Sequence, residues 1–191
     1  MTYSSLARLG EHLQHVEQVL STLQQHKLYV NMEKCSFGMQ SIQYLGYIID
    51  TKGVHVDPIK IQIIRNWPSP KTFTELHSFL GLAKFYRRFV LNFSHISWPH
   101  NQSLRGGAQA KFQWTEEKQQ AFEELKKILC STLVLVLLDL QQSFEIETDA
   151  FDYALGVVLV QHGHPISYHS ETFSDTVYRY PTYDKELYAI V

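Results

Sequence analysis

Two carboxylates occupy positions where they could take part in metal chemistry. Asp149 ends the alternating segment "FEIETD", and Glu186 lies in "YPTYDKELYAIV", on or beside the apolar stripe that Tyr183 and Ile190 indicate. A carboxylate on the packed edge of a helix is unfavourable unless a cation or a hydrogen-bond donor meets it. Two such groups could share a hard divalent cation such as Mg²⁺, and a pair of these ions can promote phosphodiester hydrolysis. Two acids do not fill two metal sites, however, and an Asp at a turn often serves only as a turn residue.

A second candidate site is cationic. Lys84, Arg87 and Arg88 stand at i, i+3 and i+4, so one helix face would carry all three charges. Three aromatic residues interleave with them: Phe85, Tyr86 and Phe89. Arginine and aromatic side chains mixed in this way suit phosphate contacts and stacking on sugars or bases. The alternative is a solvated helix face with core aromatics behind it.

Charge is distributed unevenly along the chain. Residues 1–115 contain 12 Lys and Arg against 6 Asp and Glu, whereas residues 116–191 contain 5 against 13. The basic first part is suited to approach a polyanion. With 191 residues, of which 45% are hydrophobic, the composition predicts one large or two small globular domains and excludes the disordered and fibrous classes.

Targeting and redox features are sparse. The longest apolar run, residues 133–138, is too short to cross a membrane, and the N-terminus lacks the apolar core of a signal peptide. Cys35 and Cys130 have no closely spaced metal-type partner, so we expect reduced thiols. These features predict an intracellular protein, cytoplasmic or nuclear, that is neither secreted nor membrane-bound.

The first part of the chain predicts helices and a small β element. Residues 11–26 have the period of an amphipathic helix, whose apolar stripe should pack on another element. Strand-like pieces follow at 28–31 and 43–49, with a hairpin turn near Gly53 and a short helix from Pro58 that ends near Trp67. A longer helix is predicted from Thr74, with the apolar period continuing to Phe93.

The second part predicts one helix and then a sheet. Thr115 precedes residues 116–129 as an N-cap, with acids in the first turn and lysines in the last. The pattern then changes to β in "LVLVLL", "FEIETD", "ALGVVLVQ" and "ISYHS", and a final helix begins near Pro181. The fold class predicted is therefore mixed α and β (α+β or α/β).

Several ordered motifs together resemble one family. The segments "EHLQHVEQVLSTLQQHKLYVNMEKCSFGMQSIQYLGYIID", "FLGLAKFYRRFVLNFSHI", "FQWTEEKQQAFEELKKIL", "FEIETDAFDYALGVVLVQHGHPISYHSETFS" and "YPTYDKELYAIV" are similar to the Pol polyprotein of gypsy-class LTR retrotransposons, especially chromovirus-type copies. The similarity covers nearly the whole chain from about residue 11. The family's activities are RNA-directed DNA synthesis and hydrolysis of the RNA strand of an RNA–DNA hybrid.

This resemblance implies a layout in three parts. Residues 1–54 correspond to the C-terminal part of a reverse transcriptase palm, 55–107 to a helical thumb, and 108–191 to a connecting helix and the N-terminal part of an RNase H-like domain. It implies that Tyr44, Leu45 and Gly46 stand at the primer grip. It further implies that the segment from Lys84 to Arg88, with Tyr86 and Arg87, lies against an RNA–DNA hybrid or a template–primer duplex. Asp149 and Glu186 match the family's Mg²⁺-binding, catalytic Asp and Glu.

Departures from the family pattern lead to a further expectation. No Asp-Asp pair occurs in the chain, the family's later RNase H aspartates have no counterpart before Val191, and Phe151 replaces the usual Ser of "TDAS". We therefore expect a fragment of a reverse transcriptase and ribonuclease H that is inactive alone. A non-catalytic nucleic-acid-binding module and a non-functional product of a decayed element are the alternatives, and the oligomeric state is left open.

Overall fold

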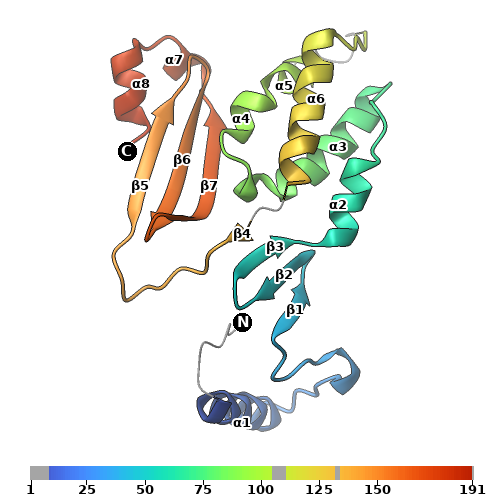
Figure 1. Cartoon of the computed structure of the whole chain (residues 1–191), viewed down its shortest axis with the longest axis vertical. Coiled ribbons are helices and arrows are strands. Elements are labelled where there is room, and N and C mark those ends of the chain that lie inside the picture. The colour runs from blue at the N-terminus through green and yellow to red at the C-terminus, as the bar shows by residue number, and fades with distance from the viewer. Residues whose placement is uncertain (1–8, 105–110, 132–133, 191) are drawn as a thin grey trace.

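The computed structural model describes residues 9–104, 111–131 and 134–190 and contains two antiparallel sheets joined by a group of helices (Figure 1). The first sheet has the order β1-β2-β3-β4 and the second the order β5-β6-β7. The fold class is mixed α+β, as the sequence predicts. In the described residues no helix is both long and apolar enough to cross a membrane.

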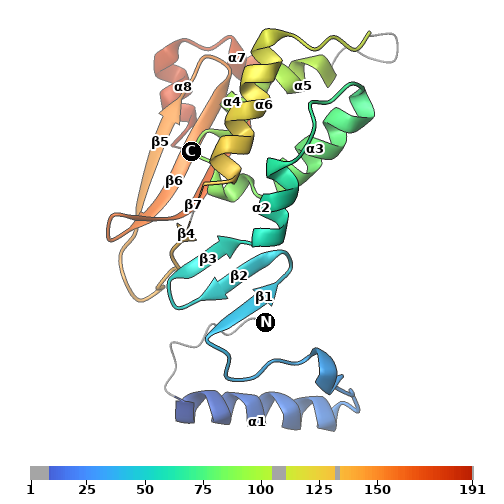
Figure 2. The same cartoon turned by 45° about the vertical axis from the view of Figure 1, so that its right-hand side comes forward.

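The N-terminal helix α1 (Leu9–Gln25) lies at one end of the molecule, beyond β1, in both views (Figure 1, Figure 2). Its extent agrees with the predicted helix at 11–26. The prediction that its apolar stripe packs on another element is wrong for the described residues, because Leu13 is 61% and Leu20 37% exposed. Residues 28–31 form no strand, and Asn31 instead caps the short 3-10 helix η1 (Met32–Lys34).

The first sheet is built from a three-stranded antiparallel meander and a distant strand. It contains β1 (Ser41–Tyr44), β2 (Tyr47–Asp50), β3 (Gly53–Val56) and β4 (Val134–Leu135). The single strand predicted at 43–49 is wrong, since the chain turns at Leu45 and Gly46, which both have positive φ. The turn near Gly53 is confirmed. Strand β4 pairs with β3 although 77 residues lie between Val56 and Val134 in the sequence, so local patterning could not reveal this sheet.

Within the described residues, six helices lie between β3 and β4 along the chain. They are α2 (Pro58–Arg65), α3 (Phe73–Phe85), the 3-10 helix η2 (Arg87–Phe89), α4 (Phe93–Ile96), α5 (Trp98–Leu104) and α6 (Glu116–Leu129). The side chains of Asp57, Thr72 and Thr115 cap α2, α3 and α6, respectively. The continuous helix predicted to Phe93 is wrong, because α3 ends at Phe85 and Asn92 takes a left-handed conformation (φ 55°).

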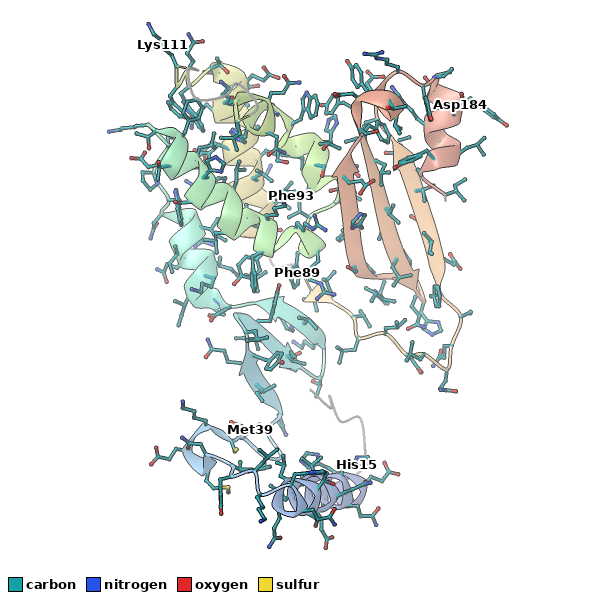
Figure 3. All side chains as sticks on the ribbon, turned by 180° about the vertical axis from the view of Figure 1, so that it is seen from behind. His15, Met39, Phe89, Phe93, Lys111 and Asp184 are labelled. Carbon is teal, nitrogen blue, oxygen red and sulfur yellow. The ribbon has the colours of Figure 1, made fainter. Side chains whose placement is uncertain are left out.

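The main hydrophobic core lies among these helices and the first sheet. Its buried members are Val56, Ile64, Leu76, Phe79, Leu80, Ala83, Tyr86, Phe89, Val90, Phe93, Phe122, Leu125, Leu129 and Leu135. Phe89 and Phe93, labelled in Figure 3, mark where the core meets the first and the second sheet. The apolar face predicted for residues 116–129 supplies Phe122, Leu125 and Leu129.

The second sheet contains β5 (Glu145–Ala150), β6 (Ala154–Gln161) and β7 (His164–Thr172), followed by α7 (Asp175–Tyr178) and α8 (Thr182–Tyr188). Helix α4 contacts this sheet. The Ser94 backbone N–H donates to Ser170 Oγ (2.9 Å), and the His95 ring packs on Phe151 and Tyr153 with centroid separations of 4.4 and 5.2 Å.

The expected domain boundaries do not match these units closely. Residue 54 lies inside β3, and β4 from the third expected part completes the first sheet. The second boundary, at 107, lies outside the described residues. Contacts of α4 with the second sheet and of β4 with β3 join the three parts. Local composition does not reveal these contacts.

Candidate nucleic-acid interface and carboxylate pair

The cationic residues lie at the end of α3 and in η2. Lys84 and Arg88 are exposed and Arg87 is half-buried. None of the three side chains has a hydrogen bond or an ion pair within the described part of the chain. Their charges are therefore not neutralised by carboxylates of this part and remain available to phosphates.

The turn between β1 and β2 lies next to these cations. Tyr44 and Tyr47 pair across a two-residue turn, where Leu45 is 70% and Tyr44 38% exposed. Tyr47 stacks on Phe85 with a centroid separation of 5.2 Å, and its hydroxyl donates to the Phe85 carbonyl (3.1 Å). The structure thus brings together two residue sets that the sequence analysis predicted separately.

Phe85, one of the three aromatic residues that interleave with the cations in the sequence, joins the two sets. It is 49% exposed and lies 3.6 Å from the position that a Cβ of Gly46 would occupy. Its place in the run of alternating cations and aromatic residues from Lys84 to Phe89 was the sequence signal for it. Since an exposed ring beside cations can stack on sugars or bases, Phe85 belongs to the candidate interface together with Tyr44, Leu45, Lys84 and Arg88.

Tyr86 does not belong to the exposed interface. It is only 1% exposed, and its hydroxyl donates to the Gly46 carbonyl (2.9 Å). A buried ring cannot stack on a base, so the expectation of a direct nucleic-acid contact is corrected for this residue. Its aromatic neighbours Tyr47 and Phe85 both meet its ring edge to face. The helical period places Tyr86 three residues after the buried Ala83 and leaves Phe85 off the apolar face, which agrees with the alternative of core aromatics behind a solvated face.

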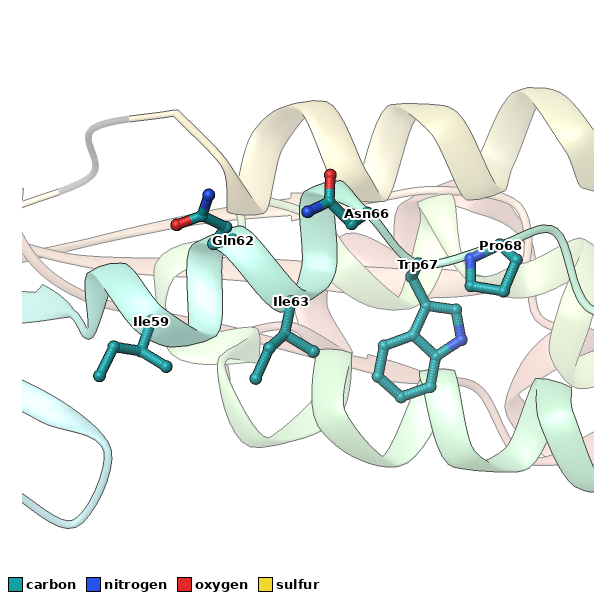
Figure 4. Close-up of a pocket in the computed structure, with 6 residues that line it drawn as sticks. All are labelled: Ile59, Gln62, Ile63, Asn66, Trp67 and Pro68. Atoms are coloured by element: carbon teal, nitrogen blue, oxygen red, sulfur yellow. The ribbon is translucent and has the colours of Figure 1, made fainter.

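An apolar groove lies on α2, on the same helical part of the molecule. It has a volume of about 490 Å³ and is lined by Ile59, Gln62, Ile63, Asn66, Trp67 and Pro68. Figure 4 shows Ile59, Ile63 and Trp67 on one side of the helix and Gln62 and Asn66 on another. Ile59 is 64% and Ile63 43% exposed, so this side of α2 offers an apolar surface bordered by amides. This groove was not among the sites predicted from the sequence.

Asp149 is the penultimate residue of β5 and is exposed. Ala150 packs in the small cluster around Leu155, so strand alternation turns Asp149 to the opposite face. There it lines a pocket of about 480 Å³ between the sheet and residues Leu91 and Asn92. Glu145 and Glu147 line the same pocket, so this face of the sheet is acidic.

Glu186 lies on α8, which contacts β5 (Figure 1). It is half-buried, but the apolar stripe expected to pack on the sheet is exposed, with Tyr183 at 73% and Ile190 at 71%. The residue that α8 buries is Lys185, whose Nζ donates to the Asp152 carbonyl (2.7 Å). Within the described residues neither Asp149 nor Glu186 has a hydrogen-bond or ion-pair partner.

These carboxylates do not by themselves fit a divalent-metal site. No group of three or more His, Cys, Asp or Glu side chains in the described ranges is arranged to hold a metal ion. RNase H-like domains typically use divalent metals, which need several oxygen ligands. Asp149 faces the pocket beside Asn92, whereas Ala189 at the end of α8 packs with Ala150 on the opposite face, so the described residues do not bring the two carboxylates into one site and no hydrolytic step follows.

The sequence is similar to known protein families over most of its length. Residues 114–191 match the RNase H-like domain found in reverse transcriptase. Over 183 residues the chain is 37% identical to the Pol polyprotein from transposon 297 of Drosophila melanogaster, covering 96% of this chain and 17% of that protein. It is 35% identical over 192 residues to the Pol polyprotein from transposon gypsy of the same organism, with 95% and 19% covered. The chain belongs to the retrotransposon Pol family.

This Pol segment is also similar to a yeast transposon polyprotein and to viral reverse transcriptases. It is 34% identical over 187 residues to the transposon Tf2-3 polyprotein of Schizosaccharomyces pombe, covering 95% of this chain and 14% of that protein. The foamy viral protease-reverse transcriptase in complex with an RNA/DNA hybrid superposes with a TM-score of 0.81 at 27% identity, over 97% of this chain and 26% of that one. Another structure, in complex with double-stranded DNA, has a TM-score of 0.80 at 27% identity, over 97% and 40%. The segment spans less than a fifth of the length of each of the three transposon polyproteins, 297, gypsy and Tf2-3.

Proposed function

We propose that this Pol segment binds an RNA–DNA hybrid or a template–primer duplex through the surface formed by Tyr44, Leu45, Lys84, Phe85 and Arg88. The observation that carries this proposal is the contact of Tyr47 with Phe85, which places the exposed turn beside unpaired cations. The foamy viral enzymes that share its fold are in complex with nucleic acid. Arg87, which is half-buried, adds a third charge at the edge of this surface.

Electrostatics supports this choice of surface over the second sheet. The exposed face of β5 carries Glu145, Glu147 and Asp149, whereas η2 carries Arg87 and Arg88. A polyanion is repelled by the first face and attracted by the second. The apolar groove along Ile59 and Ile63 offers additional contact area to sugars without adding charge.

Asp149 and Glu186 have a separate place in the proposal. Asp149 faces the pocket beside Asn92, whereas Ala189 at the end of α8 packs in the cluster on the other face, so either carboxylate would serve a Mg²⁺ site only together with ligands from outside the described residues. This segment alone therefore neither extends a primer nor cleaves a hybrid. Cleavage of a hybrid by the purified chain with Mg²⁺, lost on Asp149→Asn, would overturn this part of the proposal.

The binding test uses a fluorescently labelled RNA–DNA hybrid and fluorescence anisotropy at about 50 to about 200 mM salt. Replacing Lys84, Arg87 and Arg88 with Ala together should weaken binding and lower the slope of log Kd against log salt by about 2 to 3, because each phosphate contact contributes about 0.9. The control replaces the exposed Lys52, Lys111 and Lys127 with Ala, which removes the same charge elsewhere. Equal effects of the two triple variants would show that binding is not localised to this surface.

A further inference from the structure

The turn at the interface has an unfavourable backbone. Leu45 has φ 48° and Gly46 φ 81°, so both central residues are left-handed. Two-residue hairpin turns of this kind favour Asn-Gly or Asp-Gly, and a branched aliphatic residue such as Leu is disfavoured at the first position. The turn keeps this shape only if surrounding contacts hold it.

Two hydrogen bonds hold the Gly46 carbonyl. The Tyr86 hydroxyl donates to it at 2.9 Å, and the Asp57 backbone N–H donates at 3.3 Å. The fit is close, because a Cβ on Gly46 would lie 3.0 Å from the Tyr86 hydroxyl oxygen. The shorter of the two bonds is made by Tyr86, which belongs to the hydrophobic core of the helical part.

Tyr86 is itself held firmly. Its ring is 1% exposed and meets Tyr47 and Phe85 edge to face. Burial raises the pKa of the Tyr86 phenol to about 12, with a smaller contribution from Tyr47, so the hydroxyl stays a neutral donor at physiological pH. A fixed donor at the end of a fixed ring can determine where the turn lies.

We infer that Tyr86 is a positioning residue for the nucleic-acid interface: its hydroxyl holds the Gly46 carbonyl so that Leu45 projects beside Phe85 and the cations. The inference rests on the proposed function and deepens it. Leu45, 70% exposed at the tip of the turn, is the group whose position the hydroxyl controls. Tyr86 acts through the turn and does not touch the duplex.

The test compares two single-hydroxyl deletions in one aromatic cluster. Tyr86→Phe keeps the ring and removes the bond to Gly46, whereas Tyr47→Phe removes the bond to the Phe85 carbonyl (3.1 Å) and leaves Gly46 held. We expect Tyr86→Phe to weaken hybrid binding by about 3- to 10-fold, the usual effect of one lost hydrogen bond, with an unchanged salt slope. Tyr47→Phe keeps the stacking on Phe85 and both bonds to Gly46, so it should weaken binding less than Tyr86→Phe does.

A double-mutant cycle separates positioning from a general loss of stability. If Tyr86 acts through the turn, its effect on Kd should largely disappear in the Leu45→Ala background. All variants are compared well below their melting temperatures. Parent-like binding by Tyr86→Phe, or effects of Tyr86→Phe and Leu45→Ala that simply multiply, would overturn the inference.

Amide hydrogen exchange of the free chain makes the outcome independent of binding. Tyr86→Phe should speed exchange at Tyr47 and the neighbouring turn amides by about 10-fold or more, with a smaller change in Tyr47→Phe. If the parent chain fails to bind the hybrid, the proposed function is wrong. The exchange rates of the turn amides then still test whether Tyr86 holds the turn. Unchanged exchange in Tyr86→Phe would refute the positioning role.

Discussion

The side chain of Asn92 lies directly against the Cα of Gly156, so that no side chain larger than hydrogen fits on β6 at this point. Asn92 precedes α4 in a left-handed conformation, and its Oδ1 is buried with no hydrogen-bond partner in the described part of the chain. Gly156 pairs with Asp149 across the sheet. This contact sets how closely the helical part approaches β6, which lies beside the strand that carries the predicted metal ligand.

Gly156→Ala should therefore destabilise the chain by about 1–3 kcal/mol, because the new Cβ overlaps the Asn92 amide. Adding Asn92→Gly should restore much of the loss, since Gly tolerates the φ of 55° and the deleted amide had no described partner. Urea unfolding measures both effects. Gly81→Ala is the control, because that exposed α3 position has nothing within 4 Å and Ala favours the helix. Equal losses at 156 and 81 would contradict the contact.

Gly53 tests whether β4 is an integral strand of the first sheet. A Cβ at Gly53 would overlap the Leu135 carbonyl, and its φ of 136° is itself unfavourable for other residues. Gly53→Ala should cost more than 2 kcal/mol, roughly the sum of steric overlap and backbone strain. Gly163→Ala (φ 74°, nothing within 4 Å) carries only the strain and should cost about 1 kcal/mol. Equal losses of stability for Gly53→Ala and Gly163→Ala in thermal unfolding would mean that β4 can shift away from Gly53 at little cost.

Some of this architecture follows from local sequence and some does not. Residues 116–129 form the predicted helix because apolar period, Thr115 cap and terminal charges agree. Strand β4 is two residues long and exists by pairing with β3, which no local pattern encodes. The sequence also singled out the carboxylates Asp149 and Glu186. It did not show that α8 buries Lys185 and leaves its apolar stripe exposed, because that depends on how the helix is rotated against the sheet.

His100 should make stability depend on pH. It is fully buried, stacks on Trp114 (5.4 Å), and neither ring nitrogen has a hydrogen-bond partner within the described residues. Burial lowers its pKa to about 4 from 6.5, and Lys118 adds to the effect. Because protonation then favours the unfolded chain, this contribution is complete above pH 6.5 and decreases as the pH falls towards 4.

The loss attributable to His100 should reach about 2–3 kcal/mol, and His100→Phe should remove it while keeping the stacked ring. Urea unfolding at about pH 7.5 and about pH 4.5 measures the difference between the two proteins. His77→Ala, at an exposed α3 position, should retain the parent's pH dependence. An identical pH dependence in His100→Phe would show that His100 is not the responsible group.

Lys185 rather than the apolar stripe should anchor α8 on the second sheet. Its ammonium donates to the Asp152 carbonyl (2.7 Å) and lies 5.8 Å from the Phe173 ring centroid and 5.4 Å from that of Tyr178. Lys185→Ala should destabilise the chain by about 1–3 kcal/mol, because it leaves the carbonyl without this charged donor and removes the packed stem. Tyr183→Ala, at a side chain that is 73% exposed, should change stability by less than about 0.5 kcal/mol. Amide exchange in α8 should show the same order, and a larger effect of Tyr183→Ala would mean that the helix packs by its apolar stripe after all.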